Sequence, residues 1–210
     1  RLMKNSNIVI VDYEAGNTFS VFNAIASLGY NKVTISHHEE FIRKADALIL
    51  PGVGAFDTCA DNLRYRNLDK ILEEEVFTNS KPILGICVGM QLLASYSEEN
   101  GIHQGLGWIE GAVKKIDIDT NILSVPHVGW NEVNCKIKDP IFEKNEDNAH
   151  FYFDHSYHFQ CDSEFVAATC DYGITIIGGV QKNNIYGVQF HPEKSQNSGL
   201  KLFRSFLNSV

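Results

Sequence analysis

The residues best suited to chemistry are a cysteine between two glycines and, much later in the chain, a histidine two positions before a glutamate. Cys87 lies in KPILGICVGMQ (81–91), and His191 and Glu193 lie in VQFHPEKS (188–195). A cysteine nucleophile needs a base that holds the thiolate and protonates a leaving amine, and a carboxylate that orients the base. Residues two apart in an extended chain project to the same side. These types and spacings predict nucleophilic catalysis by Cys87, His191 and Glu193, although a surface His beside a Glu is common.

The sequence around Cys87 predicts a strand-to-helix turn. A short apolar run ends at Ile86, and a helical pattern of Met90, Leu92 and Leu93 follows. Glycines at 85 and 89 suit the strained conformation of such a turn, and a helix N-terminus favours a thiolate. A buried structural cysteine is the alternative, and it explains neither glycine.

A second glycine-containing loop, PGVG at 51–54, follows another apolar strand. In open α/β sheets, the loops after neighbouring strands converge at the ligand site. We expect Gly52 or Val53 in this loop to supply one backbone oxyanion donor, and the N–H of Val88 to supply the other. A plain turn explains Pro-Gly equally well.

The elements that position these loops alternate between strand and helix. Strands are predicted by the apolar runs at 7–11, 33–35 and 47–50. Helices are predicted by the apolar pattern at Phe19, Phe22, Ile25 and Leu28 and by the stretch 39–44. A longer helical stretch is predicted over 56–77, with a break near Asn67. Such βαβ units predict a mostly parallel open sheet with helices on both faces.

The second half of the chain has a different pattern. Alternating runs at 112–118, 151–160, 165–172 and 174–181 predict antiparallel strands, with Asn183-Asn184 forming a hairpin to 185–190 and a last helix after about 200. The fold class is therefore α/β. We expect one domain over 3–210 and interpret Arg1 and Leu2, which precede Met3, as a cloning remnant.

Composition excludes several classes of function. A net charge of −8 and a pI near 5.4 leave no basic stripe for nucleic acid, and no apolar stretch is long enough to span a bilayer. Five cysteines without C-x-x-C spacing argue against disulfides and against a structural zinc site. We expect a cytoplasmic protein with reduced thiols, no membrane or nucleic-acid partner, no metal and no cofactor.

These motifs together resemble the class I (triad) glutamine amidotransferases, with a flavodoxin-like fold. The resemblance runs nearly end to end and is strongest to the glutaminase subunits of imidazole glycerol phosphate synthase. The stretches that carry it are Asp12-Tyr13, Gly16-Asn17, 50–56, 85–93, Ser97-Glu98-Glu99, PHVGWN (126–131), His155-Ser156-Tyr157 and 187–196.

The resemblance implies that Cys87 attacks the side-chain amide of glutamine, with His191 as base and acid and Glu193 orienting it. It also implies a glutamine pocket lined by Gly52, Gln91, Glu99, His155 and Ser156, with Glu99 opposite the α-ammonium. Family members dock on a (β/α)8-barrel synthase (cyclase) subunit as a heterodimer. The released ammonia passes through the barrel to form imidazole glycerol phosphate and aminoimidazole carboxamide ribotide, in histidine biosynthesis.

The resemblance also implies a partner-gated glutaminase. The expected partner interface is Trp130, Tyr152, Asp154 and Lys194, and the expected moving part is the loop 51–54, where glycines permit a peptide flip. Two positions depart from the family pattern: Asp154 stands where an apolar residue is usual, and Thr18-Phe19 follows Gly-Asn.

Both departures keep a paralogous function open, in which ammonia serves another acceptor such as a surface-sugar amidotransferase system. A cysteine peptidase or hydrolase is a further alternative, but it gives no reason for Gln91 and HPEKSQ. A non-catalytic scaffold is disfavoured because no member of the triad is missing.

Overall fold

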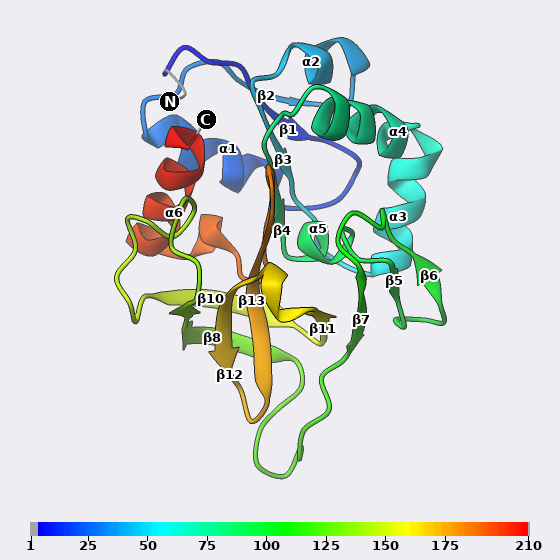
Figure 1. The fold of residues 1–210 in the computed structure, drawn as a ribbon, viewed down its shortest axis with the longest axis vertical. Coiled ribbons are helices and arrows are strands. Elements are labelled where there is room, and N and C mark those ends of the chain that lie inside the picture. The colour runs from blue at the N-terminus through cyan, green and yellow to red at the C-terminus, as the bar shows by residue number, and fades with distance from the viewer. Residues whose placement is uncertain (1–3, 210) are drawn as a thin grey trace.

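The fold is built on an eight-stranded sheet in the order β2-β1-β3-β4-β14-β13-β12-β9 (Figure 1). The structure, a computed structural model, describes residues 4–209. The interpretation of Arg1 and Leu2, and the expected domain start at Met3, lie outside these residues.

The first five strands of this sheet are parallel, as the sequence predicted. They are β2 (Val33–Ser36), β1 (Ile8–Val11), β3 (Ala47–Leu50), β4 (Ile83–Ile86) and β14 (Ile185–Val188). Four of the five are buried at every position, with only β2 at the edge partly exposed. Continuous apolar runs are what a parallel sheet covered on both faces requires.

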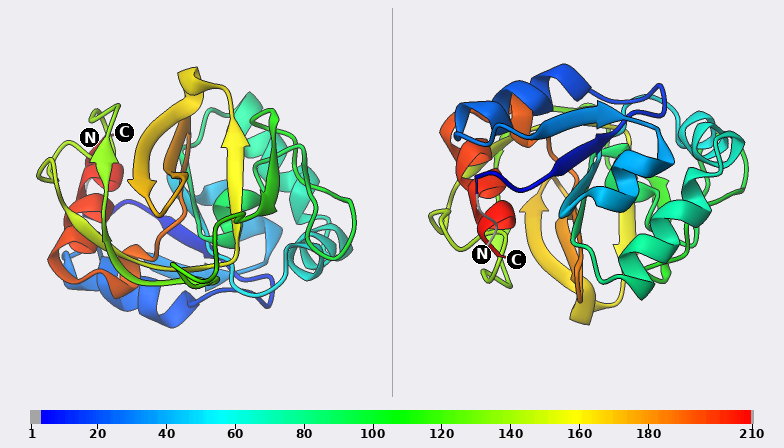
Figure 2. Two further views of the ribbon diagram at one scale, coloured as in Figure 1. Left: turned by 90° about the horizontal axis from the view of Figure 1, so that it is seen from below. Right: turned by 90° about the horizontal axis from the view of Figure 1, so that it is seen from above.

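Helices cover both faces of the sheet (Figures 1 and 2). On one side α1 (Thr18–Ser27) packs against α6 (Gln196–Asn208). On the other side lie α2 (Glu39–Lys44), α3 (Phe56–Tyr65) and α4 (Leu68–Glu73), the last continuing as a π-helical turn (Glu74–Thr78). Asn67, between α3 and α4, has a φ of 57°, so the predicted helix break is confirmed. The short α5 (Val88–Gln91) follows β4.

The expected apolar face of α1 was wrong at its first position. Phe19 is 75% exposed, whereas Val21 and Ile25 are fully buried. The inward stripe runs through 21, 25 and 28, and position 19 lies on the opposite side of the helix.

The antiparallel half extends the same sheet. β13 (Thr175–Lys182) pairs with β14 through the predicted Asn183-Asn184 hairpin. On its other side β13 pairs with β12 (Val166–Asp171), which follows a 3₁₀ turn (Ser163–Phe165). β12 in turn pairs with the short edge strand β9 (Asn134–Cys135). Asn183 has a φ of 54°, a left-handed conformation that Asn tolerates well.

Two smaller sheets complete the fold. One pairs β8 (His127–Glu132) with β10 (His150–His155); the other has the order β11-β7-β5-β6, formed by Tyr157–Cys161, Gly111–Lys115, Tyr96–Ser97 and His103–Gln104. The single strand expected over 151–160 was wrong, because the chain breaks at Ser156 and changes sheet. The strand expected over 112–118 ends at Lys115, and β8 was not expected.

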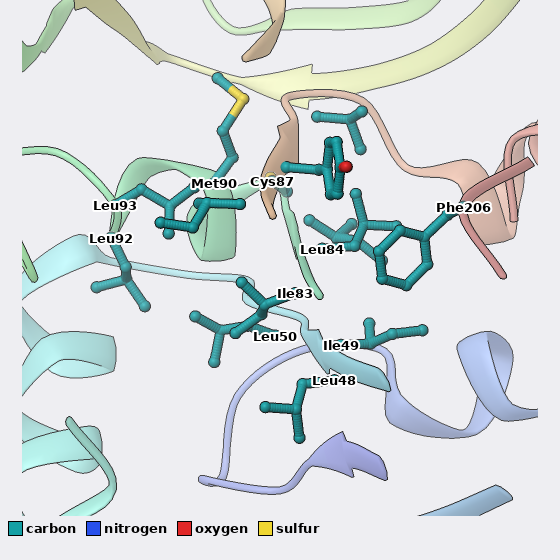
Figure 3. Packing of buried hydrophobic residues seen from close by; sticks show 14 of the residues in the cluster. Leu48, Ile49, Leu50, Ile83, Leu84, Cys87, Met90, Leu92, Leu93 and Phe206 are labelled. Carbon is teal, nitrogen blue, oxygen red and sulfur yellow. The ribbon is translucent and has the colours of Figure 1, made fainter. Parts of the chain in front are cut away.

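The apolar centre of the molecule lies directly beneath the cysteine turn. Figure 3 shows Leu48, Ile49 and Leu50 of β3 beside Ile83 and Leu84 of β4, all buried. The catalytic candidate therefore projects from the rigid, fully buried middle of the sheet, where parallel strands end at one edge.

Candidate active site

Cys87 occupies the strand-to-helix turn that the sequence predicted. Its φ of 55° and ψ of −112° are a strained conformation for a residue with a Cβ. The flanking glycines permit this conformation because the backbone packs closely against their Cα atoms. A Cβ at Gly85 would lie 2.6 Å from the carbonyl oxygen of Gly89, and a Cβ at Gly89 would lie 1.9 Å from the carbonyl oxygen of Leu50. Any other residue at 85 or 89 would push β3, β4 and α5 apart.

The helix after Cys87 is shorter than expected. It spans only Val88–Gln91, and Leu92 and Leu93 lie beyond it. One turn has a weak dipole, so we assign stabilisation of a thiolate to neighbouring charge rather than to the helix.

His191 and Glu193 are in contact, but not in the extended conformation that was expected. β14 ends at Val188, and Pro192–Lys194 forms a 3₁₀ turn with proline in its first position. The turn brings Nδ1 of His191 to 2.6 Å from Oε1 of Glu193, with both side chains buried. Asn17 donates to the same oxygen at 3.4 Å.

The charge state of His191 is set by its two neighbours. Burial opposes protonation, but hydrogen bonds and charge from Cys87 and Glu193 outweigh it and raise the pKa of His191 to about 10. Glu193 bonds Nδ1, which leaves Nε2 as the nitrogen for the thiol. The arrangement favours a protonated His191 at neutral pH.

A cavity of about 440 Å³ opens over this pair. It is lined by ten of the residues that the sequence singled out: Val53, Cys87, Val88, Gln91, Glu99, Asp154, His155, Ser156, His191 and Lys194; and by Asn17, Gly54, Pro126 and Tyr157. Gly52, Glu193, Trp130 and Tyr152 do not line it. Glu193 lies behind His191, where an orienting group belongs.

The loop Pro51–Gly54, here called the oxyanion loop, lies against the cysteine turn with one donor already used. The N–H of Val88 donates to the carbonyl oxygen of Gly52 at 3.2 Å. The carbonyl of Gly52 thus occupies the donor that was expected to stabilise a substrate oxyanion.

Known proteins match this chain along nearly its whole length. The glutamine amidotransferase class-I family model matches residues 9–209. The chain belongs to the class I glutamine amidotransferases. It is 45% identical over 206 residues to "Imidazole glycerol phosphate synthase subunit HisH" of Pelagibacter ubique, covering 96% of this chain and 99% of that relative. It is 47% identical over 203 residues to the protein HisH 2 of Vibrio vulnificus, which carries the same synthase name, covering 97% and 94%.

A solved structure supports the fold independently of sequence. A GMP synthase protein from Thermoplasma acidophilum superposes with a TM-score of 0.73 at 22% identity, covering 97% of this chain and 94% of that one. The expected class I amidotransferase fold is therefore confirmed.

Two buried glutamines, one of them missed from sequence, are hydrogen-bonded to each other beside Cys87 in this amidotransferase site. Gln91 donates to the carbonyl oxygen of Tyr157 at 3.0 Å and to Oε1 of Gln189 at 3.1 Å. Gln189, fully buried, places its amide 3.7 Å from Sγ of Cys87. Because this contact joins residues 102 positions apart, no local sequence signal indicates Gln189.

Glu99 is a partly buried acid that lines the cavity. Its Oε2 accepts from the N–H of Phe56 at 3.5 Å. Burial and the nearby charge of Asp57 raise its pKa, while the Phe56 hydrogen bond acts in the opposite direction. A carboxylate held this way favours a bound cation.

His155 is fixed by a directed chain of hydrogen bonds. Its Nδ1 lies 2.8 Å from the carbonyl oxygen of Tyr157 and must donate, so its Nε2 accepts from Nδ1 of His127 at 2.9 Å. Nε2 of His127 then accepts from the amide of Asn131 at 3.2 Å. Burial lowers the pKa of His127 to about 4 and of His155 to about 3, so both rings are neutral.

Three of the four expected interface residues, Trp130, Tyr152 and Asp154, lie on the outer face of the β8–β10 sheet, and Lys194 lies in the 3₁₀ turn beside it. Tyr152 pairs across the strands with Trp130, and Asp154 pairs with Val128. Trp130 is 48% exposed and Val128 is 53% exposed, which is unusual for large apolar side chains. Nζ of Lys194 lies 5.8 Å from the ring centre of Tyr152.

Metal-ligand clusters and membrane-spanning helices are both missing from the described part of the chain. Among residues 4–209, no three His, Cys, Asp or Glu side chains are grouped to hold a metal ion. No helix within the same residues has the length and apolar character to cross a membrane.

Proposed function

We propose that this chain is the glutaminase subunit of an imidazole glycerol phosphate synthase. One observation carries the chemistry: a cysteine on a strained turn, in a cavity, beside a histidine that a buried glutamate holds at 2.6 Å. The HisH relatives at 45% and 47% identity support the assignment to this synthase.

Glutamine hydrolysis proceeds in two steps at Cys87. The thiolate attacks the side-chain carbonyl carbon, the imidazolium of His191 protonates the leaving nitrogen, and ammonia departs as the thioester forms. Water then attacks the thioester while His191 accepts its proton. The carbon–sulfur bond breaks, glutamate leaves, and the proton returns to the thiolate–imidazolium pair.

Recognition of glutamine falls to the residues around the cavity. Glu99 pairs with the α-ammonium group, which removes the cost of its partial burial. His155 and Ser156, at the break between β10 and β11, and Gln91 complete the lining.

The oxyanion loop is the part of the site that switches glutamine hydrolysis on and off. As it stands, Val88 donates to Gly52, so one donor is unavailable to substrate. Turning the peptide between Gly52 and Val53 frees Val88 and aims the N–H of Val53 into the cavity. The turn carries Val53 toward positive φ, which a β-branched residue resists, so a partner must drive it. One missing oxyanion donor costs about 10² to 10³ in rate, enough for a switch.

The partner is a (β/α)8-barrel synthase subunit that docks over Trp130, Tyr152, Asp154 and Lys194. The partly exposed ring of Trp130 and the exposed Val128 beside the cavity mouth support this surface, since aromatic side chains are enriched at interfaces. Ammonia then leaves the cavity directly into the barrel. We place the pair in the cytoplasm, which agrees with five free thiols in the described chain.

One feature favours a second candidate, a paralogous barrel serving another acceptor. Asp154 is exposed at the cavity mouth and makes no ion pair with any of residues 4–209. A docked partner must therefore supply a polar or basic side chain opposite its carboxylate, or leave that carboxylate hydrated. A partner shaped for the usual apolar residue would not do so.

The test measures glutamate release by the free protein, by its mixture with the histidine-pathway barrel of the same organism, and by its mixture with any paralogous barrel, each with and without acceptor ligand. We expect low activity of the free protein and strong activation by the first barrel. Activation only by a paralogous barrel would move the protein out of histidine biosynthesis, and cleavage of peptides but not glutamine would establish the peptidase alternative.

A further inference from the structure

Cys59, in α3, is a buried thiol that the proposed chemistry does not use, yet it contacts the oxyanion loop. It is 1% exposed, and its Sγ donates to the carbonyl oxygen of Val53 at 3.4 Å. Burial raises the pKa of Cys59 to about 12, so the thiol keeps its proton at neutral pH and remains a donor.

The upstream side of the oxyanion loop is fixed by packing. A Cβ at Gly52 would lie 2.7 Å from the backbone nitrogen of Gly89 and 2.8 Å from the hydroxyl of Tyr13. That hydroxyl, itself fully buried, donates to the carbonyl oxygen of Pro51. Packing therefore holds Pro51 and the Cα atom of Gly52 in place, and the peptide that can turn begins at the Gly52 carbonyl.

The downstream side has room to move. A Cβ at Gly54 would meet no atom within 4 Å, and the φ of Gly54 is +91°. Within residues 4–209, the thiol of Cys59 is the only hydrogen-bond donor to the carbonyl of Val53. The resting conformation on this side thus depends on one hydrogen bond.

We propose that Cys59 is a positioning residue that holds the oxyanion loop in its resting, donor-occupied conformation and so suppresses glutamine hydrolysis by the free subunit. This proposal rests on the proposed glutaminase function and its gate. Turning the Gly52–Val53 peptide strains Val53, and the strain relaxes by rotation of the next peptide, whose carbonyl Cys59 holds. The thiol bond is therefore made in the resting state and lost in the active one.

The test compares Cys59→Ala, which removes the donor, with Cys59→Ser, which keeps one. Glutamine turnover is measured for the free subunit and for the subunit saturated with its barrel partner. Because the lost interaction is one hydrogen bond between neutral groups, we expect Cys59→Ala to raise the kcat of the free subunit about two- to tenfold. The KM and the activity of the complex stay unchanged. Cys59→Ser restores the low free-subunit rate. Cys59→Val, which fills the space without a donor, matches alanine.

The matched control is Cys170→Ala, which removes another buried thiol far from the loop and leaves the free-subunit rate unchanged. If Cys59→Ala and Cys59→Val leave that rate unchanged or lower it, while the wild-type complex is active, the positioning role of Cys59 is wrong and the glutaminase function stands. A wild-type protein that releases no glutamate with any barrel instead overturns the proposed function itself.

Discussion

At the scale of single residues, the proposed site consists of a strained nucleophile, Cys87, and two buried helpers, His191 and Glu193. Cys87 adopts a φ of 55° because the glycines at 85 and 89 allow the close approach of β3 and α5. The sequence indicated Cys87, His191 and Glu193 because their types are informative. It did not indicate Gln189, whose role depends on a contact with Cys87 that only the folded chain creates.

The two helpers of Cys87 differ in their expected importance. His191→Ala removes the proton carrier from both steps, whereas Glu193→Gln keeps a hydrogen-bonding partner for Nδ1. We expect Glu193→Gln to retain about ten- to a hundredfold more kcat than His191→Ala, as unequal members of a triad do. Steady-state glutamine turnover with the barrel partner measures both. Equal losses would mean that the carboxylate does more than orient the ring.

At the scale of elements, strands that bury apolar residues were predictable, and strands that expose them were not. β3 matched its expected bounds, and the β13–β14 hairpin followed from Asn183-Asn184. β8 was missed because its apolar Val128 and Trp130 face outward and His127 faces inward, the reverse of the pattern that identifies a half-buried strand. The break at Ser156 follows from sheet pairing that is not local in sequence.

The buried His127–His155 pair predicts acid sensitivity of the fold. Both pKa values fall from the usual 6.5 to about 4 and about 3, so the folded state binds fewer protons than the unfolded state below pH 6.5. Stability from this pair is complete above pH 6.5 and is lost as pH falls through about 4 toward about 3. The raised pKa of His191 acts in the opposite sense, but only as pH rises from 6.5 toward 10.

Urea unfolding at a series of pH values checks this expectation. The free energy of unfolding falls with acidification in the wild type and falls less steeply in His127→Gln, which cannot gain the proton. Exposed His150→Gln serves as the control and keeps the wild-type slope. Parallel slopes for wild type and His127→Gln would refute the contribution of the pair.

The oxyanion loop makes a separate prediction for Val53. Replacing this β-branched residue by glycine removes the penalty for positive φ, so Val53→Gly should raise turnover by the free subunit, by about tenfold or less. The activity of the complex should change little, because the proposed partner already drives the flip. A free-subunit rate no higher than wild type would mean that strain at Val53 does not hold the gate closed.

At the scale of the whole molecule, the parallel sheet delivers the cysteine turn, the oxyanion loop and the His191 turn to one edge, and the β8–β10 sheet places an exposed face beside them. The α/β class was predictable from alternating apolar runs. The placement of the small sheets was not, since it depends on crossovers between distant strands. The extent of the domain, 3–210, stays a prediction.

Asp154 makes docking a test of partner identity. If the true barrel supplies a basic counterpart, Asp154→Asn weakens binding about tenfold and reduces its salt dependence, because a charge pair at an interface edge acts through long-range attraction. Asp162→Asn, an exposed acid remote from the cavity, is the matched control. Binding titrations at low and high salt with each candidate barrel give the result. Unchanged affinity for every barrel would show that Asp154 stays in water.

The central claim is that Cys87 forms a covalent bond with glutamine, and one labelling experiment tests it most directly. The protein, in complex with its barrel, is treated with a glutamine analogue that carries an electrophilic side chain, and the modified residue is located by mass spectrometry. We predict a single label on Cys87, loss of glutamine turnover in proportion to labelling, and no label in Cys87→Ala, which keeps its fold. A label on Cys59, Cys161 or another thiol, or turnover that survives Cys87→Ala, would contradict the account.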